Sequence, residues 1–205
     1  MLGFWKGKAP LLLASKSAAR QALLAAVRIP FETMASAIDE RLIEAPLLEK
    51  NAPAAEIAAH LAQAKAHSIS VLRPDRLVLG ADQTLSFNKR TFSKPATIAE
   101  ARAQIEGFSG QTHELHSALC LMRDGSMLFE TVTTARLTCR TLTRRFVDRY
   151  MEAAGDDVLA SVGAYQAEGL GMHLFEKIEG DHATILGLPL LSLLVFLRRE
   201  GSLVG

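Results

Sequence analysis

Residues 79–95, LGADQTLSFNKRTFSKP, combine the end of an apolar run, a turn signal and a returning segment that closes on Lys-Pro. Because the run that leads into this stretch, RLVLG, is mostly apolar, we expect a buried strand over residues 76–82 that ends on a carboxylate, Asp82. Asn88-Lys89 is typical of a hairpin turn, and the returning segment closes on Lys94-Pro95. Ligand sites in α/β sheets lie beyond the carboxyl ends of strands. The pattern therefore predicts a functional site at Asp82, with Lys94 returning toward it.

Strand-like and helix-like segments alternate around this stretch, which indicates an α/β fold. Apolar runs and turn signals predict further strands at 11–15, 31–36 and 173–178, and two long strands joined at Asp124-Gly125. Caps and periodicity predict helices at 17–29, 53–71, 96–108, 143–155 and from Pro189 onward. We expect residues 1–205 to form a single domain, a mixed sheet flanked by helices and divided by a cleft into two lobes.

The composition is that of an ordinary globular protein. The 205 residues are 49% hydrophobic and 22% charged, with a formal net charge of +1. That balance disfavours stable nucleic-acid binding, which needs a basic excess. The start of the chain lacks the apolar core of a signal peptide, and no apolar run reaches the length of a membrane span. We therefore expect a cytoplasmic protein whose Cys120 and Cys139 are reduced thiols.

Two groups of residues are candidates for phosphate chemistry. Ser15, Ser17 and Arg20 lie where a strand passes into a helix, and a helix N-terminus attracts anions; alternatively the serines only cap the helix and Arg20 is solvated. Among Glu40, Lys65, Asp82 and Lys94, the carboxylates can hold a divalent ion or a water and the lysines can neutralise oxyanions. The alternative for this second group is a set of surface salt bridges.

Other motifs carry weaker or more ambiguous signals. The histidines of HELH, His113 and His116, point to opposite faces of a strand, which disfavours a zinc site. GFWKGK near the start is too tight for a phosphate-binding P-loop. The glycines of GAYQAEGLG (163–171) imply that its backbone passes close to something flat or bulky. Glu168 within it is either a turn residue or a reader of a nucleotide base.

Taken together, these stretches resemble the Maf family of nucleoside triphosphate pyrophosphatases. The matching segments occur in family order and cover about residues 11–200. They are LLLASKSAAR, Asp39-Glu40, LAQAKA, LGADQ, SKP, FSGQTHEL, VGAYQAEGLG and EKIEGDHATILGLPL.

The resemblance implies a fold like that of the inosine triphosphatases (Maf/Ham1 type) and hydrolysis of a nucleoside triphosphate to the monophosphate and pyrophosphate. It implies a divalent metal, Mg or Mn, held by Asp82 and Glu40. The implied catalytic residues are Asp82, Glu40 and Lys94, with Lys94 offsetting the charge of Asp82. The implied substrate-binding residues are Ser15, Ser17, Arg20, Lys65, Gln83 and Glu168.

The substrate branch is indicated by departures from the common family pattern. Ala18 and Ala19 replace the usual Pro-Arg of the phosphate loop. Gln83 and Glu168 look like the branch that acts on 7-methyl-GTP, whereas the dTTP/UTP branch usually has threonine and glutamine there. A dTTP/UTP pyrophosphatase and a non-catalytic nucleotide-binding regulator of cell division remain the alternatives. A homodimer is also possible.

Overall fold

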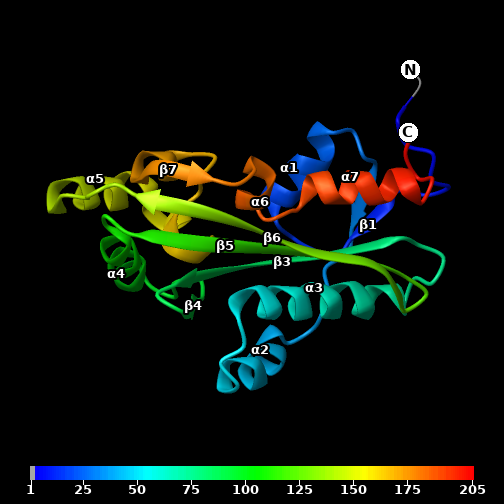
Figure 1. Ribbon diagram of the computed structural model, residues 1–205, viewed down its shortest axis with the longest axis horizontal. Helices are drawn as coiled ribbons and strands as arrows, with labels where there is room; N and C mark the ends of the chain where they lie inside the picture. The colour runs from blue at the N-terminus through cyan, green and yellow to red at the C-terminus, as the bar shows by residue number, and fades with distance from the viewer. Residues whose placement is uncertain (1–2) are drawn as a thin grey trace.

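A seven-stranded mixed sheet forms the centre of the molecule (Figure 1). The structure is a computed structural model, and it describes residues 3–205. β1 pairs in parallel with β2 and β3, and the other strand pairs are antiparallel, which confirms the predicted mixed α/β fold. The strands along the sheet are β2 (Phe31–Thr33), β1 (Leu11–Leu13), β3 (Val78–Phe87), β5 (Thr112–Arg123), β6 (Ser126–Cys139) and β7 (Phe175–Glu179), with β4 (Arg90–Phe92) paired to β3.

The open edge of β3 is what creates a site. On one side β5 pairs with β3 from Val78 to Ser86. On the other side β1 pairs only as far as Leu79, and β4 pairs only from Leu85 onward. Residues 80–84 therefore have no strand partner on that edge among the described residues. The sheet splits there, and Asp82 lies in the middle of the split.

The prediction that the strand ends at Asp82 was wrong. β3 continues to Phe87, because Asp82 is paired with Ala118 of β5 and the antiparallel ladder runs on past it. What ends near Asp82 is the parallel pairing with β1, whose last backbone bond joins Ala14 N to Leu79 O at 2.8 Å. Asp82 thus lies beyond the carboxyl end of β1, although it is not at the end of its own strand.

Helices cover both faces of the sheet. α3 lies under it with α2 below, α1, α6 and α7 lie above it, and α4 and α5 lie at the far end (Figure 1). None of the helices within residues 3–205 is long and apolar enough to cross a membrane. The α-helices are α1 (Ala18–Ala26), α2 (Glu40–Glu49), α3 (Ala54–Ser70), α4 (Ile98–Phe108), α5 (Arg144–Ala154), α6 (His182–Ile185) and α7 (Leu190–Arg199), and the short 3₁₀ turns are η1 (Gly155–Leu159), η2 (Val162–Ala164) and η3 (Leu170–Leu174).

The helix starts follow the capping chemistry of the sequence. Ser17, Thr97 and Thr143 each accept a hydrogen bond from the backbone N–H three residues on, as N-caps do. Pro53 and Pro189 directly precede α3 and α7. Some ends differ from the prediction: α1 stops at Ala26, β2 stops at Thr33, and β7 begins at Phe175.

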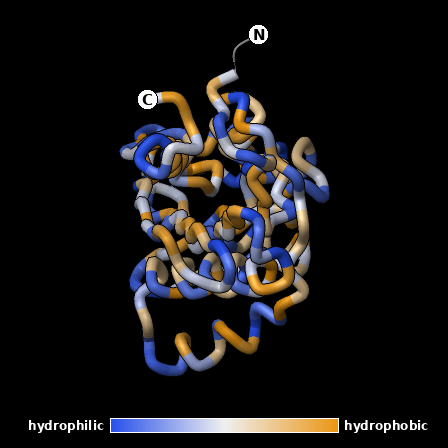
Figure 2. Tube along the Cα trace, turned by 90° about the vertical axis from the view of Figure 1, so that its right-hand side faces the viewer, coloured by the Kyte–Doolittle hydropathy of each residue, from blue (hydrophilic) through white to orange (hydrophobic). Residues whose placement is uncertain are grey.

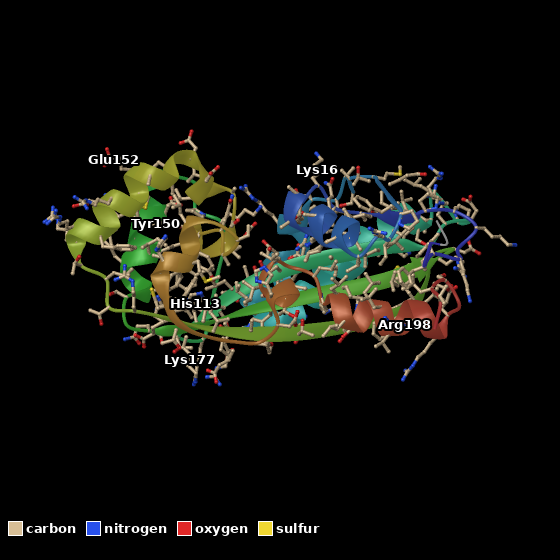
Figure 3. All side chains as sticks on the ribbon, turned by 90° about the horizontal axis from the view of Figure 1, so that it is seen from above. Lys16, His113, Tyr150, Glu152, Lys177 and Arg198 are labelled. Carbon is tan, nitrogen blue, oxygen red and sulfur yellow. The ribbon has the colours of Figure 1, made fainter. Side chains whose placement is uncertain are left out.

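The apolar core is divided between two ends of the sheet. One region joins β5 and β6 to α4 and α5, with Phe108 and Val147 among its buried residues. At the other end, one cluster includes Leu24 and Leu193 of α1 and α7, and another includes Ala62 of α3. Seen from above, Tyr150 lies on one group of helices, and Lys16 lies beside a separate group (Figure 3). These two ends are the predicted lobes.

α2 was not predicted from the sequence. Asp39 caps it by accepting from Arg41 N at 3.0 Å, and Pro46 lies inside it. None of its residues is buried, and Leu42 is 75% exposed. It is the lowest segment in Figure 2, where hydrophobic and hydrophilic residues alternate along it. Glu40 therefore begins a helix that stands apart from the sheet.

Candidate active site

A cleft of about 980 Å³ opens at the split in the sheet. The segment after β1 forms one wall, the start of α2 forms another, and residues 91–94 and 160–168 close the far side. All the site residues predicted from the sequence line this one cleft: Ser15, Ser17, Arg20, Glu40, Lys65, Asp82, Gln83, Lys94 and Glu168. Segments far apart in the chain thus bring the predicted phosphate-binding and acidic residues together.

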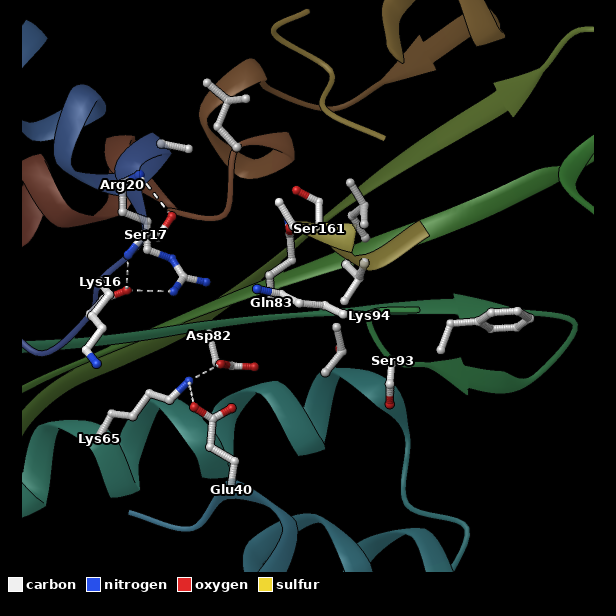
Figure 4. Close-up of a pocket in the computed structure, with 18 of the residues that line it drawn as sticks. Lys16, Ser17, Arg20, Glu40, Lys65, Asp82, Gln83, Ser93, Lys94 and Ser161 are labelled. Carbon is white, nitrogen blue, oxygen red and sulfur yellow. Dashed lines mark hydrogen bonds and ion pairs between the residues drawn. The ribbon is translucent and has the colours of Figure 1, made fainter. Parts of the chain in front are cut away.

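Asp82 belongs to a chain of three charged groups. Lys65 Nζ lies 2.5 Å from Asp82 Oδ1 and 2.9 Å from Glu40 Oε1 (Figure 4). The side chains of Lys65 and Asp82 are only 10% and 11% exposed, whereas that of Glu40 is 50% exposed. A buried pair of this kind holds its geometry much better than a surface salt bridge.

Gly80 brings Lys65 close to Asp82. A Cβ atom at Gly80 would lie 2.1 Å from the carbonyl oxygen of Ala62, so only glycine lets α3 pack this tightly against β3. Lys65 lies one turn beyond Leu61 on the buried face of α3. The close contact between α3 and β3 therefore places the ammonium group of Lys65 beside the carboxylate of Asp82.

The predicted partner of Asp82 was wrong. Lys65 neutralises Asp82, and Lys94 makes no ion pair within residues 3–205. β4 pairs with β3 only at Leu85–Phe87, so Lys94, just beyond β4, lies across the cleft from Lys65 (Figure 4). Its exposed ammonium group remains available to a bound anion.

Ser15, Ser17 and Arg20 form the wall that follows β1. Ser17 caps α1, accepting from Arg20 N at 3.4 Å, and Ser15 Oγ accepts from Arg20 Nη1 at 3.0 Å. Arg20 is 8% exposed and is therefore not the solvated side chain of the alternative interpretation. Burial lowers the pKa of Arg20, and the charges of Asp82 and Glu40 act against that shift. Lys16 is exposed and lines the same cleft.

Glu44 is a cleft residue that the sequence did not reveal. It lies one helical turn after Glu40 on α2 and faces the same acidic group. Burial and the negative charges of Asp82 and Glu40 raise the pKa of Glu44, against smaller opposite effects of Lys65 and Arg41. The signal for Glu44 is its spacing of four from Glu40, which has meaning only once α2 is known to be a helix.

Gln83 is held by the protein itself. Its Nε2 atom donates to Ser117 Oγ, Thr184 O and Ile185 O, each at 3.0 Å. Two of these partners are carbonyls, and Ser117 Oγ donates its own hydrogen to Thr184 O at 2.7 Å. Only an NH₂ group can face three acceptors, so the orientation of the amide is determined. What Gln83 has left to offer the cleft is its carbonyl oxygen.

The glycine-rich loop, residues 163–171, packs against the apolar core of the protein. A Cβ at Gly163 would lie 2.7 Å from Leu85 Cδ1 and 2.8 Å from Tyr165 Cε1, so the bulky neighbour expected there is the core. Tyr165 Oη lies 2.7 Å from His113 Nε2, which ties the loop to β5. Burial lowers the pKa of His113 to about 4, so its ring is neutral near pH 7 and belongs to the core.

Glu168 lies on the exposed rim of this loop. The backbone around it turns tightly, with Gly169 N and Gly171 N both donating to Gln166 O, at 3.2 and 3.1 Å. The loop therefore presents the carboxylate at the cleft mouth rather than inside the core.

The carboxylates of the cleft fit a divalent cation that binds together with a polyphosphate. Within residues 3–205, no group of three or more His, Cys, Asp or Glu side chains is arranged to hold a metal ion. Mg²⁺ in nucleotide enzymes needs only one or two protein carboxylates, because phosphate oxygens and water complete its shell. Asp82 and Glu40 supply two carboxylates, and Lys65 now lies between them.

Known proteins resemble this chain over nearly its whole length. Residues 10–200 match the family described as Maf-like protein. A Nitrobacter winogradskyi protein named nucleoside triphosphate pyrophosphatase is 51% identical over 97% of this chain and 98% of its own. A Brucella suis protein named 7-methyl-GTP pyrophosphatase is 50% identical over 95% of this chain and 98% of its own. A solved HAM1 protein from Coxiella burnetii covers 66% of this chain and 75% of its own, with 18% identity and a TM-score of 0.41.

Proposed function

The chain belongs to the family of Maf-like proteins and is a nucleoside triphosphate pyrophosphatase, and we propose that it prefers a guanine-type substrate such as 7-methyl-GTP. The observation that carries the proposal is the set of groups that line the cleft: cations on both sides, a lysine-held carboxylate at its centre, and hydrogen-bond acceptors on Gln83 and Glu168. Because both core regions contribute lining residues, we propose that the chain works as one catalytic domain.

We propose that the cations bind the polyphosphate and Asp82 activates the attacking water. Arg20 and Lys94 lie on different sides of the cleft, so a phosphate chain can contact both. Asp82 can accept a proton from a water while its charge is balanced by Lys65. We propose that Asp82 and Glu40 also hold Mg²⁺ or Mn²⁺, which would stabilise negative charge on the phosphate oxygens.

The hydrogen-bond acceptors of Glu168 and Gln83 favour a guanine edge. Glu168 carries two acceptor oxygens. The NH₂ group of Gln83 is already bonded within the protein, so only its carbonyl oxygen, also an acceptor, remains for a ligand. Guanine offers two adjacent donors, N1–H and N2–H₂, whereas uracil and thymine present O4 carbonyls. Methylation at N7 adds positive charge to the ring and acidifies N1–H, which strengthens a hydrogen bond to a carboxylate.

Exchanging Glu168 for glutamine should change base preference. We expect the wild-type protein to have a higher kcat/KM for 7-methyl-GTP than for UTP, and Glu168→Gln to lower that ratio about tenfold to a hundredfold. The reason is that one acceptor becomes a donor facing N1–H or N2–H₂. Steady-state kinetics with both substrates measures the ratio.

Glu152→Gln is the matched control, since Glu152 is an exposed glutamate on α5 outside the cleft (Figure 3). It should leave the ratio at the wild-type value. An unchanged ratio in Glu168→Gln would mean that Glu168 only shapes its turn and does not read the base.

A further inference from the structure

We infer that Gly187 is a positioning residue for the polyphosphate: its carbonyl and its missing side chain aim the guanidinium of Arg20 into the cleft. The inference rests on the proposed function and adds to it a residue that need not touch the substrate. Gly187 follows α6, in the turn that leads to α7, and lies far from Arg20 in the sequence.

Arg20 is fixed by hydrogen bonds from two of its three guanidinium nitrogens. Nε donates to Gly187 O at 2.7 Å, and Nη1 donates to Ser15 Oγ at 3.0 Å. Nη2 has no hydrogen-bond partner within residues 3–205 and is not sealed from solvent, so its donors face the cleft. A guanidinium whose Nη2 donors are free can bind a phosphate oxygen through charge-assisted hydrogen bonds.

Glycine is needed at position 187 for two reasons. Its φ is +94°, a backbone conformation that residues with a Cβ rarely adopt. A Cβ there would also lie 3.3 Å from both Nε and Nη2 of Arg20. A Cβ at 187 would therefore press against the guanidinium group and shift its Nη2 donors.

The turn that carries Gly187 is anchored to the strands beside the catalytic carboxylate. Gly187 N donates to Thr184 O at 3.1 Å. The same Thr184 carbonyl accepts from Ser117 Oγ of β5 and from Nε2 of Gln83, the residue after Asp82. Arg20 is thus tied through Gly187 to the strand that holds Asp82. This linkage sets the distance between the phosphate-binding edge and the carboxylate before substrate arrives.

A guanidinium group that is already held in its binding orientation binds phosphate more tightly than a mobile one, because less side-chain freedom is lost on binding. Arginine has several rotatable bonds, and a charge alone does not orient them. We therefore expect the effect of Gly187 to appear in the affinity for a polyphosphate, even for one that carries no base.

Binding of inorganic tripolyphosphate, measured by titration calorimetry, tests the inference. Gly187→Ala should raise the Kd by roughly tenfold or more, since a misdirected guanidinium loses a charge-assisted hydrogen bond. Gly201→Ala is the matched control: Gly201 has φ +85°, and a Cβ there would meet nothing within 4 Å. It carries the same backbone strain and should leave the Kd unchanged.

A double variant separates positioning from general damage to the fold. Arg20→Lys keeps the charge but cannot bond Gly187 O and also present a planar edge, so it should bind weakly by itself. If Gly187 acts through Arg20, Gly187→Ala should then weaken Arg20→Lys little further. If the two losses multiply instead, the inference is overturned.

The remaining outcomes are equally decisive. If wild-type protein binds tripolyphosphate and Gly187→Ala binds it equally well, the inference fails while the proposed function stands. If wild-type protein does not bind tripolyphosphate, the polyphosphate site itself is wrong and both fail. If Gly187→Ala does not fold, Arg20→Lys decides: wild-type affinity in that variant contradicts an oriented guanidinium.

Discussion

Asp82→Asn should lower the turnover number for triphosphate hydrolysis by at least about 10²-fold, the usual scale for removing a positioned general base. The amide is nearly isosteric with the carboxylate but cannot accept a proton from water or carry its charge. We expect the variant to fold, because Lys65 keeps its contact with Glu40 at 2.9 Å. Release of pyrophosphate with magnesium present measures the rate, and a thermal melt measures folding.

The matched control for this variant is Asp75→Asn. Asp75 is exposed in the turn before β3, so its replacement should leave the rate unchanged. If Asp82→Asn kept a rate close to that of the wild type, Asp82 would have no catalytic role.

Lys65→Met should have the largest effect on stability. Methionine keeps the buried stem of the side chain but removes the one ion-pair partner that Asp82 has within residues 3–205; the Asp82 side chain is 11% exposed. An unpaired buried charge typically costs about 3 kcal/mol of unfolding free energy. We expect that loss in a urea titration at pH 7, together with loss of hydrolysis.

The double variant Lys65→Met/Asp82→Asn identifies the cause of that loss. Removing the uncompensated charge should restore much of the stability while activity stays low. If the double variant were as unstable as Lys65→Met alone, lost packing of the lysine stem would explain the effect better than an unpaired carboxylate.

Local chemistry was the part of this fold that could be predicted. The turns at Asn88-Lys89 and Asp124-Gly125 adopt positive φ angles, 51° and 62° for the first and 51° and 69° for the second. Asn, Asp and Gly adopt such angles more readily than other residues. Ser17, Thr97 and Thr143 cap the helices they precede. These features depend on a few adjacent residues, so the sequence is sufficient to place them.

The errors concern features that depend on distant partners. Asp82 looked like the end of a strand, because a charged residue after an apolar run resembles a boundary. Its partner on β5 is Ala118, which is 36 positions away in the sequence. α2 buries none of its residues and contains Pro46, a residue that usually argues against a helix interior, so the sequence did not point to it. Either lysine could have been assigned to Asp82 from the sequence, and the packing of α3 against Gly80 decided for Lys65.

Gln83 is a residue of the site whose bonding partners also could not be predicted from the sequence. Its side chain looks like a reader of a base edge, yet its NH₂ group bonds backbone carbonyls 101 and 102 residues away. Main-chain carbonyls leave no trace in a sequence, because every residue has one. The polar group that remains for a ligand is therefore known only from the structure.

The central claim is that this cleft cleaves a nucleoside triphosphate between its α- and β-phosphates. Separating the products of 7-methyl-GTP hydrolysis by ion-exchange chromatography, with magnesium present, tests it most directly. We expect 7-methyl-GMP and pyrophosphate in equal amounts from the wild-type protein and almost none from Asp82→Asn. Formation of 7-methyl-GDP and orthophosphate, or equal yields from both proteins, would contradict it.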